Sequence, residues 1–317
     1  MKVKNVASIL FTKFNLVFKM IIFLLILSFV LAIISSAFFL PVLNGLRNDI
    51  EELNLVDNAA DYIKSLLKGE DTSESYDALV DSIKKIPAIS DKWDINIIFS
   101  VVFLLLIIFI FAVFYYMAYY TVGDILYSFM SSNSKFGFTS NYIYNMKKSF
   151  RFALIYAAIV IAYYFIMFSL TFIIALLFGK VSAYLGLFVF FLLAYGVLAL
   201  RRALFVYWIP YLVIEGCTPI EALKNNFNHL KGHFLKFFAE YYVVYLCFVM
   251  TSFLVSIFTA GVGIIINYAI SWLVMQIMDN VEFYNLKGKK YYIDEQTVVD
   301  PKLKYRDAVI EDDNFSL

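Results

Sequence analysis

Long apolar runs alternate with shorter polar segments along the whole chain. Because a helix needs about 20 apolar residues to cross a bilayer, this pattern predicts six membrane spans. The spans lie near Phe18–Leu40, Ile95–Tyr120, Phe152–Phe178, Val181–Leu200 with an apolar extension to Ile214, Phe238–Ala260, and Val262–Phe283. The expected fold is therefore all-α: a polytopic membrane protein built as a six-span helical bundle.

The polar segment 41–94 has a helical pattern of its own. Its apolar residues recur at spacings of three and four from Leu46 to Leu67, the stretch "GEDTSES" follows as a turn, and a second stripe ends at Pro87. The segment is therefore predicted to form an amphipathic helical hairpin. A stripe of this kind usually packs against its own protein, so we expect the hairpin to cover the ends of the spans. A dedicated ligand-binding cap is the alternative.

Two connectors, 139–151 and 218–237, predict amphipathic helices that lie at the membrane surface. In the second, Thr218 can accept a hydrogen bond from the third helical amide, and Glu221 can complete a capping box. Both connectors start near a threonine, contain asparagine and basic residues, and lead into an aromatic-rich span, which indicates a degenerate internal repeat. Their basic residues, which can contact anionic lipid, are Lys147, Lys148, Lys224, Lys231 and Lys236.

Composition and charge agree with the membrane class and orient the chain. Of 317 residues, 62% are hydrophobic and only 16% are charged, unlike the balance of soluble domains. Residues 1–20 contain four lysines and no acid, whereas 41–94 contains six basic and twelve acidic residues. Since positive charge favours the cytoplasmic side, both termini are expected in the cytoplasm and the hairpin outside. The first apolar run is too long for a cleaved signal peptide, so it is expected to stay as an anchor.

Four parts follow from these patterns. They are a cytoplasmic N-terminus with the first span at 1–40, an acidic extracytoplasmic loop at 41–94, a five-span membrane bundle with the two interfacial helices at 95–283, and a flexible cytoplasmic tail at 284–317. The tail mixes six basic and seven acidic residues with little apolar periodicity. Richness in Asn, Lys, Ile and Tyr is typical of an AT-rich bacterial genome, so the expected location is a bacterial plasma membrane.

Arg201 and Arg202 interrupt an apolar run that continues to Ile214. Either the fourth span ends at these arginines, or one long tilted helix holds both charges inside the membrane. Acidic residues at the span ends could form salt bridges with them that fix helix packing. The alternative is a polar pocket for an anionic headgroup or solute. The acidic candidates are Glu240, Asp124, Glu215, Asp279 and Glu282; the candidate pocket consists of Arg201, Arg202, Glu215, Glu240 and Asp279.

Other chemistry has weak support in the sequence. His229 and His233 share a helix face at metal-ligand spacing, but the "LKG" between them lacks a catalytic glutamate and no third ligand is visible. We interpret them as an interfacial pair. Known nucleophile, zinc-protease and phosphate-loop motifs are absent. We therefore expect no catalytic residue, no metal and no cofactor, and the formal net charge of +1 argues against a nucleic-acid partner.

The run "LALRRALFVYWIPYLVIEGCTPIEALKNNFNHLKGHF" resembles the multispan membrane domain attached to some bacterial glycerophosphodiester phosphodiesterases, and its stand-alone relatives of unknown function. The matching residues are Arg201 or Arg202, Pro210, Glu215, Gly216, Ala222, Leu223, Lys224, Phe227, Lys231 and Gly232. Asn226 stands where that family usually has serine. The resemblance implies a multispan membrane domain. The phosphodiesterase activity of that family belongs to a separate soluble domain, so no catalytic residue is implied here.

The leading functional hypothesis is a non-enzymatic membrane scaffold that organises lipid, chiefly anionic lipid on the cytoplasmic side, or binds a membrane-protein partner or a second copy of itself. The alternative is a transporter of a small or lipidic anionic substrate, with Arg201, Arg202 and Glu240 lining its path. A membrane enzyme ranks last, because the sequence offers no catalytic constellation.

Overall fold

The computed structural model describes residues 2–68, 72–90, 95–179, 182–261, 263–302 and 309–311. The helices are α1 (Lys2–Thr12), α2 (Asn15–Leu53), α3 (Leu55–Lys68), α4 (Ser73–Ser90), α5 (Ile95–Ser132), α6 (Phe138–Tyr144), α7 (Met146–Gly179), α8 (Ala183–Leu204), α9 (Trp208–Ile214), α10 (Pro219–Leu230), α11 (Phe234–Thr259) and α12 (Gly263–Lys287). Short strands follow: β1 (Tyr291–Tyr292), β2 (Thr297–Val299) and β3 (Val309–Glu311).

Six stretches of these helices are long and apolar enough to cross a membrane. They are Asn15–Ala37, Val102–Ser132, Met146–Gly179, Tyr184–Ile214, Phe234–Thr259 and Gly263–Lys287. The prediction of an all-α polytopic membrane protein with six spans is confirmed. Which side of the membrane each terminus occupies stays a prediction.

The chain divides into two compact units, which we describe separately. Unit 1 comprises Met1–Leu27, Ala112–Ile161 and Tyr195–Leu317, and unit 2 comprises Ser28–Phe111 and Ala162–Ala194. Unit 1 contains most of the residues that the sequence marks as candidates for function.

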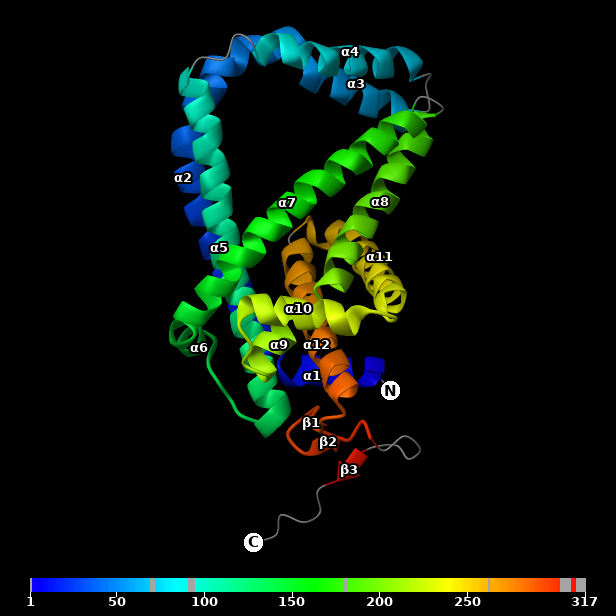
Figure 1. Ribbon diagram of the computed structural model, residues 1–317. Helices are drawn as coiled ribbons and strands as arrows, with labels where there is room; N and C mark the ends of the chain where they lie inside the picture. The colour runs from blue at the N-terminus through cyan, green and yellow to red at the C-terminus, as the bar shows by residue number, and fades with distance from the viewer. Residues whose placement is uncertain are drawn as a thin grey trace. The chain divides into compact units, whose positions relative to one another are not determined.

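Helix α12 provides the core of unit 1. Every residue from Met275 to Tyr284 is buried, although this part of the helix includes Asp279, Asn280 and Glu282. Helices α1 and α11 pack directly against α12, and Figure 1 shows α1 and α10 lying across its direction. The separate helix α1 was not predicted; the sequence analysis treated its residues as a basic approach to the first span.

The fourth apolar run is broken just after the two arginines. Helix α8 ends at Leu204 and α9 begins at Trp208. The break frees backbone groups, and Asn226 of α10 binds two of them: its Oδ1 accepts from the Tyr207 amide at 2.9 Å and its Nδ2 donates to the Leu204 carbonyl at 2.7 Å. Pro210 lies in the first turn of α9, where a missing amide costs no hydrogen bond. The apolar run is therefore not one continuous helix: α8 ends two residues after Arg202, and α9 continues the run to Ile214.

The expected flexible tail is wrong over its first part. Helix α12 continues to Lys287, and β1, β2 and β3 form an antiparallel sheet in that order. Tyr291, Ile293 and Val299 are buried, and the Tyr291 hydroxyl accepts a hydrogen bond from Asn5 of α1 at 2.8 Å. The strands are only two or three residues long, so apolar and polar residues cannot alternate often enough along them to predict a strand from the sequence. Residues 303–308 and 312–317 of the predicted tail lie outside the described residues.

A turn fixed by Asp294 joins β1 to β2. Its Oδ1 accepts from the backbone amides of Gln296 and Thr297 at 2.9 and 2.6 Å. Burial acts to raise the pKa of Asp294, but the two amides outweigh it and hold this pKa below its usual range. The tail is therefore tied down by local chemistry as well as by apolar contacts.

Unit 2 contains the predicted hairpin. Helices α3 and α4 pack along each other, and Asn58 donates to the Ser82 hydroxyl at 2.8 Å. Tyr76 of α4 donates to the Leu176 carbonyl of α7 at 2.7 Å. The first half of the predicted apolar stripe belongs to the end of α2, because Asn54, with a φ of 48°, separates α2 from α3. The predicted turn partly lies outside the described residues, at 69–71.

Candidate functional site

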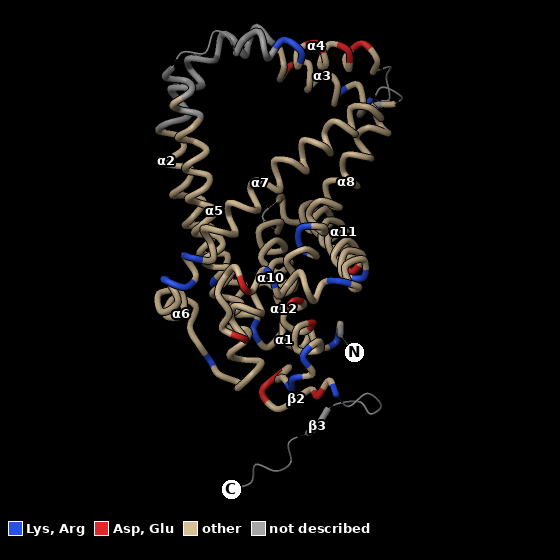
Figure 2. The backbone as a smooth tube through the Cα atoms, viewed as in Figure 1, with Lys and Arg blue, Asp and Glu red and all other residues tan. Residues whose placement is uncertain are grey.

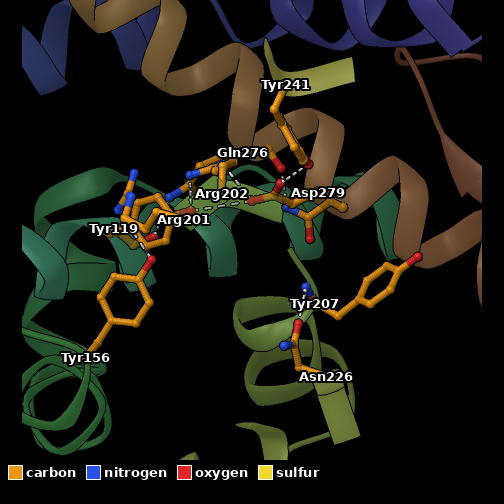
Figure 3. A network of polar contacts seen from close by, with 10 residues as sticks. Tyr119, Tyr156, Arg201, Arg202, Tyr207, Asn226, Tyr241, Gln276 and Asp279 are labelled. Carbon is orange, nitrogen blue, oxygen red and sulfur yellow. Dashed lines mark hydrogen bonds and ion pairs between the residues drawn. The ribbon is translucent and has the colours of Figure 1, made fainter. Parts of the chain in front are cut away.

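A buried ion pair joins four helices of unit 1. Arg202, in the last turn of α8, places Nη2 2.5 Å from Oδ2 of Asp279 on α12, and each side chain is no more than 5% exposed. Tyr241 of α11 donates to Oδ1 of Asp279 at 2.5 Å. The Tyr119 hydroxyl of α5 contacts Nη1 of Arg202 and donates to Oδ2 of Asp279 at 3.4 Å. Figure 3 shows these side chains converging on the carboxylate.

Neighbouring groups complete this buried cluster. Gln276, one turn before Asp279, donates to the Tyr119 carbonyl at 2.9 Å and so ties α12 to α5. The Arg202 guanidinium lies 5.1 Å from the centre of the Tyr119 ring and 6.0 Å from that of Tyr241, within cation–π range. The two charges neutralise each other and the surrounding groups exclude water. This arrangement supports the salt-bridge interpretation of Arg202 and Asp279.

Arg201 points to a different neighbourhood from Arg202. Its Nη1 donates to the Tyr156 hydroxyl of α7 at 3.4 Å. The Tyr156 ring packs edge-on against Tyr116, Phe205 and Trp208 at centroid distances of 4.6, 5.6 and 5.1 Å. Arg201 thus contacts an aromatic cluster around the α8–α9 break, and it adds a helix contact beside the ion pair.

The other predicted pocket residues have separate partners. Glu215 pairs with Lys287 at 2.9 Å, and Glu240 lies 3.9 Å from Lys236, one turn away on α11. That all five candidates share one pocket stays a prediction. The structure brings together Arg202 and Asp279, whereas Glu215 and Glu240 lie in more exposed ion pairs.

The residues that complete the cluster were largely missed. Sequence analysis did not single out Tyr119 or Tyr241, because 24 tyrosines occur along the chain and none stands out by spacing. Asn226 attracted notice only as a departure from the resembled family. The usable signal was an asparagine on an otherwise apolar face, since a buried amide must find partners.

Helix α10 has an outward face that combines basic and apolar side chains. Its inner face consists of Ala222, Asn226 and Leu230, which are buried. The outer face carries Ile220 and Phe227, 72% and 41% exposed, at helical spacing with the exposed Lys224 and Lys231. Phe227 and Leu230 are three residues apart on the helix, but the side that carries the buried Asn226 also turns Leu230 inward and leaves Phe227 partly exposed.

Other basic residues of unit 1 are exposed as well. Lys147 and Lys148 in the first turn of α7 are exposed, as is Lys236, and Figure 2 shows the distribution of these charges. Lys13 is an exception: its Nζ lies 3.9 Å from the centre of the Phe129 ring. Burial lowers the pKa of Lys13, and the positive charge of Lys135 lowers it further, whereas the negative charge of Glu295 acts in the opposite direction.

The histidine pair does not converge on a common centre. Nδ1 of His229 lies 2.8 Å from the Tyr211 hydroxyl and 3.0 Å from the Asn225 carbonyl. His233 stands at the N-cap of α11. Within the described residues, no group of three or more His, Cys, Asp or Glu side chains is arranged to hold a metal ion.

An apolar groove of about 560 Å³ opens between α1, α11 and α12. Its lining includes Val3, Val243, Cys247, Val274 and Met278, with Glu240 as its charged member. Two of its three helices, α11 and α12, are long and apolar enough to cross a membrane.

No family model, curated protein or solved structure matches the chain. The resemblance to the phosphodiesterase-associated membrane domain therefore stays a prediction.

Proposed function

We propose that the chain is a non-enzymatic scaffold of a bacterial plasma membrane that binds anionic phospholipid at the cytoplasmic surface. The observation that carries this proposal is the outer face of α10, where Ile220, Lys224, Phe227 and Lys231 share one side of a helix. Apolar tips between lysines suit the boundary between headgroups and acyl chains.

The magnitudes favour binding at this face. A lysine near an anionic surface contributes about 1 kcal/mol, and full burial of a large apolar side chain such as Phe227 contributes about 1.5–3 kcal/mol. Helix α10 is held by the buried amide of Asn226, so lipid need not order the helix before binding it. Lys147, Lys148 and Lys236 are further exposed basic residues that can contact anionic lipid.

The apolar groove between α1, α11 and α12 adds support for a lipid-binding role. Its volume of about 560 Å³ falls within the range of ligand-binding pockets, and its lining suits an acyl chain. A transporter has weaker support, because Arg202, its leading candidate residue, is neutralised by Asp279 and closed off from solvent.

Native mass spectrometry of the protein in nanodiscs of mixed phosphatidylglycerol and phosphatidylcholine tests the proposal. The wild type is expected to retain phosphatidylglycerol preferentially. In the variant Lys224→Gln/Lys231→Gln, the preference for phosphatidylglycerol over phosphatidylcholine should fall about tenfold at low salt. Each lysine contributes about 1 kcal/mol to binding, and screening by salt reduces this contribution.

The matched control is Lys289→Gln/Lys290→Gln, which removes the same charge from the exposed segment after α12. This control should keep the preference. Equal losses of preference in both variants would show that the preference depends on the net charge of the protein and not on the α10 face. No loss in the α10 variant would contradict the proposal.

A further inference from the structure

A polar cavity of unit 1 lies at the α5–α6 connection, and neither Arg202 nor Asp279 is among its lining residues. It has a volume of about 460 Å³ and is lined by Asp124, Ser128, Phe136, Ser140, Asn141 and Tyr144. Asp124 is the one acidic residue between 121 and 151. The cavity therefore places a single carboxylate among hydroxyl groups and aromatic rings.

Buried amides hold this carboxylate in place. Asn145 donates from Nδ2 to Oδ2 of Asp124 at 2.8 Å and, through the same nitrogen, to Oδ1 of Asn141. Asn141 and Asn145 are only 6% and 5% exposed. An amide can orient a carboxylate, but it carries no charge to neutralise it. The site thus keeps a net negative charge facing a cavity.

The groups around Asp124 complement an ammonium ion. The hydroxyls of Ser128 and Ser140 can accept N–H hydrogen bonds, and the aromatic rings of Phe136 and Tyr144, which line the cavity, can attract a cation. A divalent metal ion fits less well, since calcium takes six to eight oxygen ligands and the lining has one carboxylate.

We propose that this cavity, which we call the Asp124 pocket, binds the primary ammonium group of a small amine or of an aminophospholipid headgroup. Asp124 supplies the opposing charge, the hydroxyls of Ser128 and Ser140 accept hydrogen bonds from the ammonium group, and the Tyr144 ring lines the cavity. This inference is independent of the anionic-lipid proposal, because it uses none of the α10 lysines.

Calorimetric titration of the full chain in mild detergent tests the pocket and separates the two sources of ammonium. The probes are ethanolamine, dihexanoyl phosphatidylethanolamine and, as a lipid without an amine, dihexanoyl phosphatidylglycerol. Ethanolamine binding should be measurable at concentrations up to about 10 mM, the range expected for one ion pair with a few hydrogen bonds. Choline, which has no N–H group, should bind more weakly.

Asp124→Asn should lower amine affinity at least tenfold, because it removes the paired charge and keeps the side-chain shape. The control Glu221→Gln, at an exposed carboxylate of α10, should leave affinity unchanged. Tyr144 is 85% exposed, so Tyr144→Leu is expected to fold normally. It should weaken binding a few-fold through loss of the ring, which gives a second test if Asp124→Asn folds poorly.

Binding of ethanolamine alone would assign the pocket to free amines, and binding of phosphatidylethanolamine alone would assign it to a lipid headgroup. Binding of both with the expected loss in the variants supports the shared ammonium chemistry. The proposal is overturned if neither amine binds, or if Asp124→Asn and Tyr144→Leu bind both as well as the wild type does.

Discussion

Two carboxylates of unit 1, Asp279 and Asp124, differ in how their charge is satisfied. Asp279 is buried against Arg202 and two tyrosine hydroxyls. Asp124 is held by the neutral amide of Asn145 and lines an open cavity. The positive charge of the buried guanidinium neutralises the Asp279 carboxylate, so this pair does not attract a charged ligand. The neutral amide of Asn145 only orients the Asp124 carboxylate, which keeps its negative charge and can attract a cation. The comparison assigns a structural role to the first and a binding role to the second.

The largest expected difference in stability is between variants that remove the charge of Asp279 and the charge of Asp124. Asp279→Asn leaves the Arg202 guanidinium buried without its counter-charge, which should cost about 3–5 kcal/mol of unfolding free energy. Asp124→Asn should cost less than about 1 kcal/mol, because the side chain stays half-exposed and keeps a hydrogen-bond acceptor for Asn145. Denaturant titration in detergent micelles measures both variants.

A fully apolar variant separates lost pairing from lost shape. Arg202→Met/Asp279→Leu is combined with Tyr119→Phe and Tyr241→Phe, so that no buried hydroxyl loses its acceptor. Its unfolding free energy should lie within about 1 kcal/mol of the wild-type value, since such replacements are often neutral. If Asp279→Asn and Asp124→Asn destabilise the protein equally, the contrast between a structural and a binding carboxylate is wrong.

The sequence allowed the spans and the hairpin to be predicted because each depends on many residues. Apolar runs of this length admit few alternatives to a membrane helix, and the α3–α4 stripes repeat over several turns. Arg202 and Asp279 were both named as candidates, but their pairing could not be chosen over Glu215 or Glu240. That choice depends on how α8 and α12 rotate against each other, and charge spacing alone does not encode that rotation.

The short features could not be predicted, because each depends on only a few residues. Strand β1 has two residues, too few for any period to appear. The inner face of α10 could not be predicted from apolar periodicity, because the polar residue Asn226 lies on it. Its amide binds the Leu204 carbonyl and the Tyr207 amide, so a tertiary contact overrode the apolar pattern.

Asn226→Ala gives the next largest effect and tests that contact. It removes two hydrogen bonds next to the α8–α9 break, at about 0.5–1.5 kcal/mol each, so the unfolding free energy should fall by about 1–3 kcal/mol. Asn228→Ala, on the exposed face of the same helix, should change it by less than about 0.5 kcal/mol. Equal effects of the two substitutions would show that Asn226 does not fasten the break.

Asn145→Ala tests how the Asp124 carboxylate is held, and it sharpens the comparison most. The hydrogen bonds that Nδ2 of Asn145 donates to Asp124 and to the buried Asn141 are lost, which should cost about 1–3 kcal/mol. The same change frees the Asp124 carboxylate to rotate, so ethanolamine affinity in the titration should fall several-fold while Asp124 itself is unaltered. Asn226→Ala should leave that affinity unchanged, because its amide serves the α8–α9 break. A variant of Asn145 that loses stability but binds the amine normally would make this asparagine a packing residue and leave the orientation of Asp124 to the helix backbone alone.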